Sequence, residues 1–146
     1  MKFRFPLQKI VDLREQERMQ AEWRLAEALK RLREEERSFA ELERMRDDVC
    51  RIMADACVGA TTAAHLSVVG RFLTHLDGRI RRKRAELEDA ERTVSERRDD
   101  LRGRLVEERI WRNARNKALE RFRSEMLRAE QKEIDDLACA HDADRR

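Results

Sequence analysis

The chain is divided by one short stretch, CVGATTAAHL at residues 57–66, which separates two long runs of helix-compatible sequence. Between Pro6 and Gly59 there is no glycine or proline. Gly59 can supply the left-handed residue that ends a helix, and Thr61 or Thr62 can cap the next one. A connection this short makes its two helices antiparallel neighbours. The stretch therefore predicts a helical hairpin.

On both sides of the break, apolar residues recur at spacings of three and four, the pattern of a coiled coil. The expected seam of the first run is Leu7, Val11, Ala21, Leu25, Ala28, Leu32, Phe39, Leu42, Val49, Met53 and Ala56. The expected seam of the second run is Leu66, Val69, Leu73, Leu76, Ile80, Leu87, Ala90, Val94, Leu101 and Trp111. Folding back at the break makes each position i face roughly position 121 minus i.

We predict an all-α fold: a long two-helix antiparallel coiled-coil hairpin whose second helix is longer than the first, forming a single coiled-coil unit. Its expected parts are helix one at about 6–58, a turn at about 59–62, helix two at about 63–138 and a frayed tail at 139–146. Pro6 suits the first turn of helix one. The glycines at 70, 78 and 103 are expected to be tolerated inside helix two, or to let it bend.

Composition supports this fold and limits the possible functions. Of the 146 residues, 45% are charged and only one is proline, which is typical of a long helix. The net charge is +3 with both signs interspersed, which favours a solvated helix surface over a nucleic-acid-binding face. No run of about 20 apolar residues or secretory signal occurs, so membrane insertion is not expected.

No arrangement of residues indicates catalysis, so we expect neither an enzyme nor a cofactor. Cys50, Cys57 and Cys139 are odd in number and unsuited to a disulfide framework. A metal site formed by Cys50, Cys57 and His65 lacks a familiar ligand spacing, and small apolar fillers near the hairpin tip are the preferred interpretation.

Two charged features belong to the expected helix pairing. The basic run at residues 79–84, RIRRKR, falls opposite Glu34, Glu35, Glu36, Glu41 and Glu43. Ion pairing between the helices accounts for this run more simply than a nucleic-acid site. Arg97 and Arg104 fall on the seam, opposite Arg18 and the turn from Glu17 to Ala21. Their stems can cover the seam, and we expect this section to be weak.

Beyond Arg115, the second helix has no expected partner from its own chain. Its apolar stripe nevertheless continues through Ala118, Leu119, Phe122, Met126, Ala129 and Leu137. An uncovered stripe of this kind indicates a docking helix for another protein, or else a frayed or self-associated tail. Trp23, on the outer side of the first helix, is an accidental exposure or a further contact.

Three segments resemble the FliJ family of flagellar type III export stalk proteins: FRFPLQKIVDLRE at residues 3–15, the turn and following run at 59–76, and EQKEIDD at 130–136. The resemblance implies a stalk in the cytoplasm, held peripherally at the inner membrane at the flagellar base. Its joined terminal end would enter the central opening of the hexameric export ATPase. It would also contact the cytoplasmic domain of the export gate and the export chaperones.

The same resemblance suggests residues for these contacts. Those expected to face the ATPase are Gln8, Leu13, Leu119, Phe122, Met126, Gln131 and Lys132. Those expected to face the gate are Phe72 and Leu76. His65 and the pair Val68–Val69 depart from the family pattern, which puts the contacts on the tip side in doubt. The alternatives are the equivalent stalk of a virulence-type injectisome, and a generic coiled-coil scaffold that dimerises.

Overall fold

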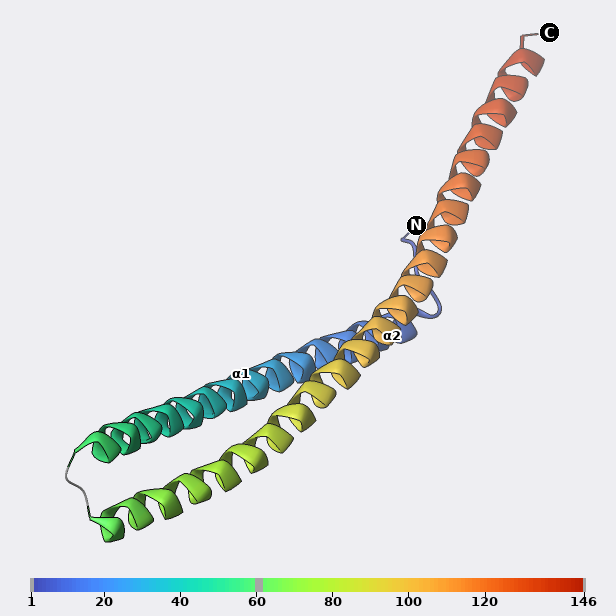
Figure 1. Ribbon diagram of the computed structural model, residues 1–146. Coiled ribbons are helices and arrows are strands. Elements are labelled where there is room, and N and C mark those ends of the chain that lie inside the picture. Colours follow the sequence, from blue (N-terminus) through green and yellow to red (C-terminus); the bar gives the residue numbers. More distant parts are fainter. Residues whose placement is uncertain (1, 60–61, 146) are drawn as a thin grey trace. The chain divides into compact units, whose positions relative to one another are not determined.

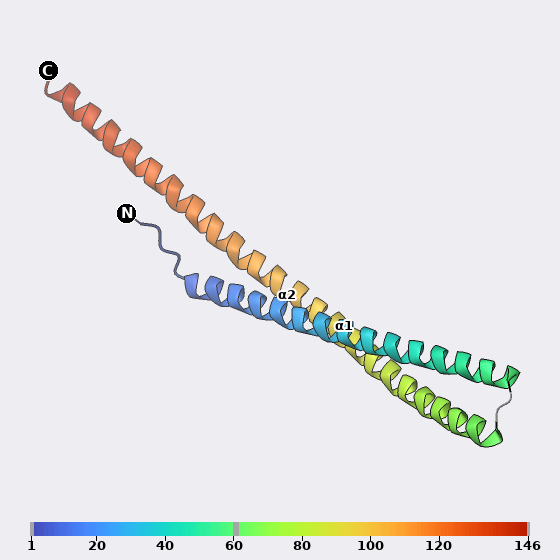
Figure 2. The same cartoon turned by 90° about the vertical axis from the view of Figure 1, so that its left-hand side faces the viewer.

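The computed structural model describes residues 2–59 and 62–145 and consists of two helices, α1 (Gln8–Val58) and α2 (Ala63–Ala143). They have 51 and 81 residues, or about 75 and about 120 Å at 1.5 Å per residue. Figures 1 and 2 show the helices running in opposite directions from the turn. This confirms the predicted all-α antiparallel hairpin with a longer second helix.

The contacts of the chain fall into two compact units. The terminal unit contains Met1–Gln20 and Arg102–Arg146, and the tip unit contains Ala21–Leu101. Each unit therefore contains one segment of α1 and one segment of α2. That the whole chain behaves as a single coiled-coil unit remains a prediction.

The predicted seam is the buried face of both helices. Every buried apolar residue in the described ranges belongs to it: Val11, Ala21, Ala28, Leu42, Leu76, Ile80, Ala90 and Val94. The other predicted seam residues are half-buried, except Leu7, which is 43% exposed. Leu7 was placed wrongly because it lies in the turn before α1, outside the helical repeat.

The densest apolar packing lies in the tip unit. Leu76 is completely buried and forms a cluster with Leu42 and Ile80, against which Phe39 and Val49 pack. Leu76 is the only large side chain in the described part of the chain that is fully buried. A two-stranded seam has few such positions, so each of them contributes a large share of the stability.

The helix ends differ in detail from the predictions. α1 begins at Gln8 rather than near Pro6, since Pro6 and Leu7 form a turn in which the amide of Gln8 donates to the carbonyl of Phe5 at 3.1 Å. Thr62 caps α2 as predicted, its hydroxyl accepting from the amide of His65 at 3.2 Å. Thr61 lies outside the described residues.

Two further predictions about helix ends were wrong. Gly59 does not adopt a left-handed conformation, because no described glycine has a positive φ. α2 continues to Ala143, past the expected end near residue 138. The sequence at 139–143 contains two alanines and no glycine or proline, so no strong helix breaker stops the helix there.

Ion pairs across the seam of the tip unit show its register. Lys83 contacts Glu35 at 3.0 Å, Arg46 contacts Asp77 at 2.6 Å, and Arg31 contacts Asp89 at 3.3 Å. The residue numbers in these pairs add up to between 118 and 123, close to the expected 121. The predicted register is therefore confirmed within this unit.

Lys83 also contacts Glu86 at 2.8 Å, one turn further along α2. Hydrogen bonds to Glu86 and Glu35 raise the pKa of Lys83, and the hydrogen bond from Lys83 lowers the pKa of Glu86. The contribution of these ion pairs to folding stability is therefore lost as the pH falls through the lowered pKa of Glu86 or rises through the raised pKa of Lys83. Between the ordinary pKa values of the two groups, this contribution is independent of pH.

We predict that Leu76→Ala lowers the free energy of unfolding by about 2–5 kcal/mol, since it leaves a cavity in the cluster with Leu42 and Ile80. Leu137→Ala is the matched control, because Leu137 is 70% exposed and its loss should change stability by less than about 0.5 kcal/mol. Urea unfolding followed by circular dichroism measures both. Equal effects of the two substitutions would contradict the seam.

Gly78→Ala should raise the free energy of unfolding by about 0.5–1 kcal/mol. A methyl group at this position meets no atom within 4 Å, so the gain in helix propensity is not offset by a clash. Thermal unfolding measures the change. A loss of stability would show instead that α2 needs the glycine in order to bend.

Candidate functional site

The terminal unit begins with a short non-helical segment, residues 2–7, that precedes α1. Figures 1 and 2 show this segment beside α2, in the part where α2 continues past the start of α1. The ring of Phe3 lies on that of Phe122, with centroids 5.5 Å apart and planes tilted by 51°. We call residues 2–7 the terminal strap.

Because of the strap, the part of α2 that contacts its own chain extends further than the paired helices do. Ala118, Leu119, Phe122 and Met126 are half-buried on α2, beyond the end of the paired helices. The prediction that α2 has no partner beyond Arg115 was therefore wrong. It was wrong because heptad counting follows only helical segments, whereas the covering residue Phe3 lies outside any helix.

After Met126, α2 is bare. Every described residue from 127 to 145 is exposed, including Leu127 (66%), Ile134 (60%) and Leu137 (70%). The helix nevertheless continues to Ala143. We call residues 127–143 the bare end. Its large apolar side chains are in water, which is unfavourable unless another molecule covers them.

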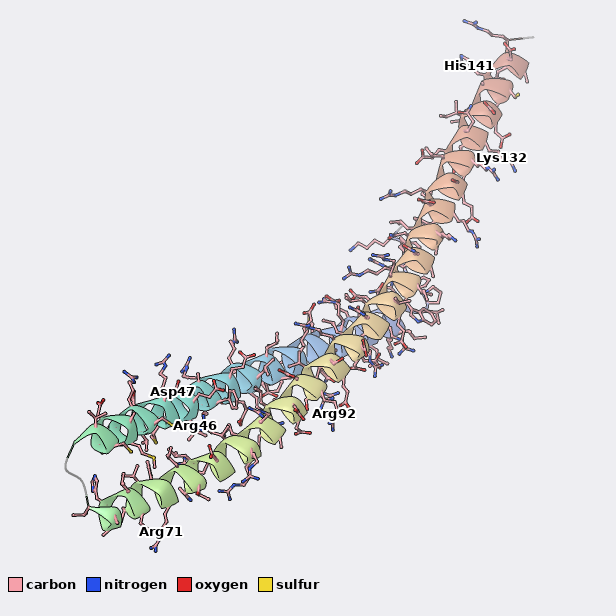
Figure 3. The ribbon with its side chains drawn as sticks, in the orientation of Figure 1. Arg46, Asp47, Arg71, Arg92, Lys132 and His141 are labelled. Atoms are coloured by element: carbon pink, nitrogen blue, oxygen red, sulfur yellow. The ribbon has the colours of Figure 1, made fainter. Side chains whose placement is uncertain are left out.

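The bare end exposes different chemistry on different sides. At 100° per residue, Leu127 and Ile134 lie on one face, and Lys132 lies on the opposite one. Figure 3 shows Lys132 and His141 projecting to opposite sides of the helix. The amide of Gln131 donates to the carboxylate of Asp135 at 2.9 Å. A partner that surrounds the helix would reach all these groups at once.

The remaining residues expected to face the ATPase lie on α1. Gln8 is half-buried, and its side-chain amide donates to Asp12 at 2.9 Å. Leu13 is 50% exposed and available for contact. The structure thus places Leu13, Gln131 and Lys132 on the surface, whereas Leu119, Phe122 and Met126 are partly covered.

An ion-pair network joins the two helix segments of the terminal unit. Arg14 contacts Glu17 at 2.9 Å and Glu107 at 3.2 Å, and Arg104 contacts Glu17 at 3.1 Å. The hydrogen bond to Glu17 raises the pKa of Arg14 above its ordinary value. Arg104 faces Glu17 as the register predicted. Its charge is paired across the helices, in addition to its stem covering the seam.

Glu108 is the only buried charged residue in the described part of the chain, at 4% exposure. Arg18 and Arg112 approach its carboxylate at 2.5 and 2.7 Å, from α1 and from α2 respectively. A buried carboxylate is costly unless it is paired, so these two arginines make its burial possible. Together these ion pairs connect α1 and α2 within the terminal unit.

In the tip unit, the two residues expected to face the gate differ in accessibility. Phe72 is 43% exposed, but Leu76 is completely buried beneath the surface. Only Phe72 can contact a partner without unfolding the seam, because Leu76 packs against Leu42 and Ile80. The cysteines are exposed rather than packed as apolar fillers, so that interpretation of Cys50 and Cys57 was wrong.

The basic run at 79–84 is less neutralised than its opposing glutamates suggested. Lys83 contacts Glu35, and Arg84 lies over the ring of Phe39 at 5.7 Å. In the described residues, Arg79 and Arg82 form no ion pair. The expected ion pairing between the helices is therefore found for Lys83 and not for Arg79 or Arg82, because only one face of α2 can reach α1.

Other kinds of site find no support in the described ranges. Within residues 2–59 and 62–145, no three histidine, cysteine or acidic side chains are grouped so as to hold a metal ion. Neither helix, as far as it is described, is apolar enough over a sufficient length to cross a membrane. Trp23 is 65% exposed, in agreement with its predicted outer position.

Comparison with known proteins identifies the family. The family model described as flagellar FliJ protein matches residues 2–142, nearly the whole chain. The chain belongs to the FliJ family. It is thus a non-enzymatic, stalk-like protein of the type III export apparatus. A comparison with curated proteins found no match.

A solved structure supports the same fold. It is described as that of a YscO homologue, CT670, from Chlamydia trachomatis, and it superposes with a TM-score of 0.73. The match covers 94% of this chain and 93% of that one, at 21% sequence identity. At this identity the likeness concerns the fold alone.

We predict that Phe3→Ala loosens residues 115–126 of α2. An aromatic pair contributes about 0.5–1.5 kcal/mol, so amide hydrogens beneath the strap should exchange about five-fold faster. Arg4→Ala is the control, because Arg4 is exposed in the same segment. Hydrogen–deuterium exchange by mass spectrometry measures the effect, and unchanged exchange in Phe3→Ala would show that the strap does not hold.

Proposed function

We propose that this FliJ-family chain is the central stalk of the flagellar export apparatus, and that its bare end docks in the central opening of the hexameric export ATPase. The observation that carries the proposal is that α2 continues through residues 127–143 with every side chain exposed. Leu127 and Ile134 offer apolar area on one side, and Lys132 offers charge on the other. A ring opening touches all sides of a helix, whereas a groove touches one.

The stalk would act on the ATPase by asymmetry. A single helix within a ring of identical subunits presents a different side chain to each subunit. Its contacts can therefore bias the subunits toward different nucleotide states. This chain contributes contacts and no step in ATP hydrolysis, in keeping with its non-enzymatic family.

On the tip side, we assign Phe72 to contact with the cytoplasmic domain of the export gate, whereas Leu76 is buried one turn further along α2. Export chaperones are further partners, for which the described surfaces suggest no particular residues. The site of action is the cytoplasmic side of the inner membrane at the flagellar base, where the chain associates peripherally.

Among the alternatives, the match to the flagellar family model favours the flagellar machine over an injectisome. The likeness to the YscO homologue supports the hairpin fold in either case. A generic coiled-coil scaffold that dimerises would differ from the stalk in its molecular mass in solution. Sedimentation of an elongated monomer supports the stalk, and a stable dimer supports the scaffold.

The pair Leu127→Asp and Ile134→Asp should reduce stimulation of the export ATPase at least about ten-fold, because charge replaces the exposed apolar contacts. The matched control is Ile52→Asp with Val58→Asp, which adds the same charge at exposed apolar positions of α1, outside the bare end. ATP hydrolysis measured with increasing stalk concentration compares the two, and circular dichroism verifies the helix content. Full stimulation by the first pair would refute docking through the bare end.

The bare end gives a cleaner test than the covered residues. A change at Phe122 would also break its contact with Phe3, so a loss of stimulation could come from the strap instead of the interface. Leu127 and Ile134 contact no other part of the described chain closely enough to be buried.

A further inference from the structure

The outer side of α2 in the tip unit carries a row of basic side chains. Arg71, His75, Arg79 and Arg82 are all exposed and follow one another at spacings of four, four and three residues. At 100° per residue they share an arc of about 80°. Figure 3 shows Arg71 pointing away from α1. We call these four residues the outer row.

The outer row is not neutralised by its own chain. Across the described residues, none of the four forms an ion pair or a hydrogen bond. The acidic groups nearby are already engaged. Asp77 is the one acidic residue between positions 63 and 85, and it contacts Arg46. Glu86 contacts Lys83.

Apolar side chains lie next to the outer row. Val68 and Phe72 are 64% and 43% exposed, and both lie within about 100° of Arg71 around the helix. Arginine and aromatic residues together are enriched where proteins bind proteins. The row is therefore a mixed basic and apolar surface, distinct from a purely solvated helix face.

The size of the row favours a protein over a nucleic acid or a membrane. Arg71 and Arg82 are separated by about 16 Å along the helix, which is short for a polyanion. The neighbouring part of α1, residues 34–58, has eight acidic and four basic residues. The excess of acidic residues on α1 would repel an extended phosphate backbone or an anionic bilayer, because both would reach beyond the row. A small acidic patch on a protein can contact the row alone.

We propose that the outer row, together with Phe72, binds an acidic patch on a partner protein. The partner's carboxylates would pair with Arg79 and Arg82, while Phe72 inserts beside them. The identity of the partner rests on the proposed function, which assigns this side to the cytoplasmic domain of the export gate. The inference that the partner's surface is acidic rests on the basic outer row itself.

Charge reversal tests the row directly. The variant Arg79→Glu with Arg82→Glu should weaken binding of the gate domain at least about ten-fold at low salt. The control Arg98→Glu with Arg109→Glu makes the same change of charge at exposed α2 positions outside the row, and should change binding less than about two-fold. Arg79→Lys with Arg82→Lys keeps the charge and should retain most of the binding. Fluorescence anisotropy with the full chain measures affinity, and thermal unfolding verifies the fold.

The outcomes separate this inference from the proposed function. If the gate domain binds all variants equally, the acidic patch is refuted and the gate assignment stands. If it binds none, including the wild type, the gate assignment fails. A poly-L-glutamate probe then decides the chemistry: binding to wild type and control, but not to the reversal, supports the row. Tighter binding of duplex RNA or phosphatidylglycerol vesicles, or self-association that the reversal abolishes, would overturn it.

Discussion

The antiparallel register of the seam is the constraint on which the other features depend. A single seam contains few fully buried side chains, and apolar residues at heptad spacing tolerate a slip by a whole repeat. Charged pairs do not. Lys83 with Glu35 in the tip unit, and Arg104 with Glu17 in the terminal unit, are brought together by nearly the same offset. Individually weak, such pairs favour one alignment because they act together.

The register in turn decides which residues of α2 are covered. With Arg14 opposite Glu107, the start of α1 at Gln8 falls short of Phe122 by more than two turns. Residues 112–117 of α2 are exposed in this interval, and at its far end Phe3 of the terminal strap packs on Phe122. The bare end is what remains. Its length therefore follows from the alignment and the strap, and not from any special property of its own sequence.

The sequence predicted the helices, their pairing and their buried faces well, because these depend on local periodicity. Val94, Ile80 and Ala90 are buried where the heptad pattern placed them. It failed where the determining contact is not periodic. Phe3 precedes Pro6 and has no place in the heptad, so its packing on Phe122 could not be read from the pattern. The alternation of Phe3 and Phe5 beside an apolar helix face was the one available signal.

Predicting the surface residues was harder, because spacing identifies a face and not its accessibility. Phe72 and Leu76 are one turn apart, and spacing alone treats them alike. Leu76 nevertheless lies at the centre of the cluster with Leu42 and Ile80, whereas Phe72 is turned far enough around the helix to reach water. Similarly, ion pairing with α1 was expected to account for the run at 79–84, although only part of a helix can face its neighbour.

The bare end is also a consequence of helix cooperativity. Starting a helix is costly, whereas extending one is nearly neutral for residues with good propensity. Residues 127–143 include four alanines, two leucines and two glutamates, and they extend a helix whose preceding turns are held by pairing and by the strap. A partner thus binds a helix that is already formed. Binding therefore costs less conformational entropy than it would if the bare end were disordered. The seam does not belong to the proposed ATPase-binding surface, but helix pairing along it allows the bare end to be helical before binding.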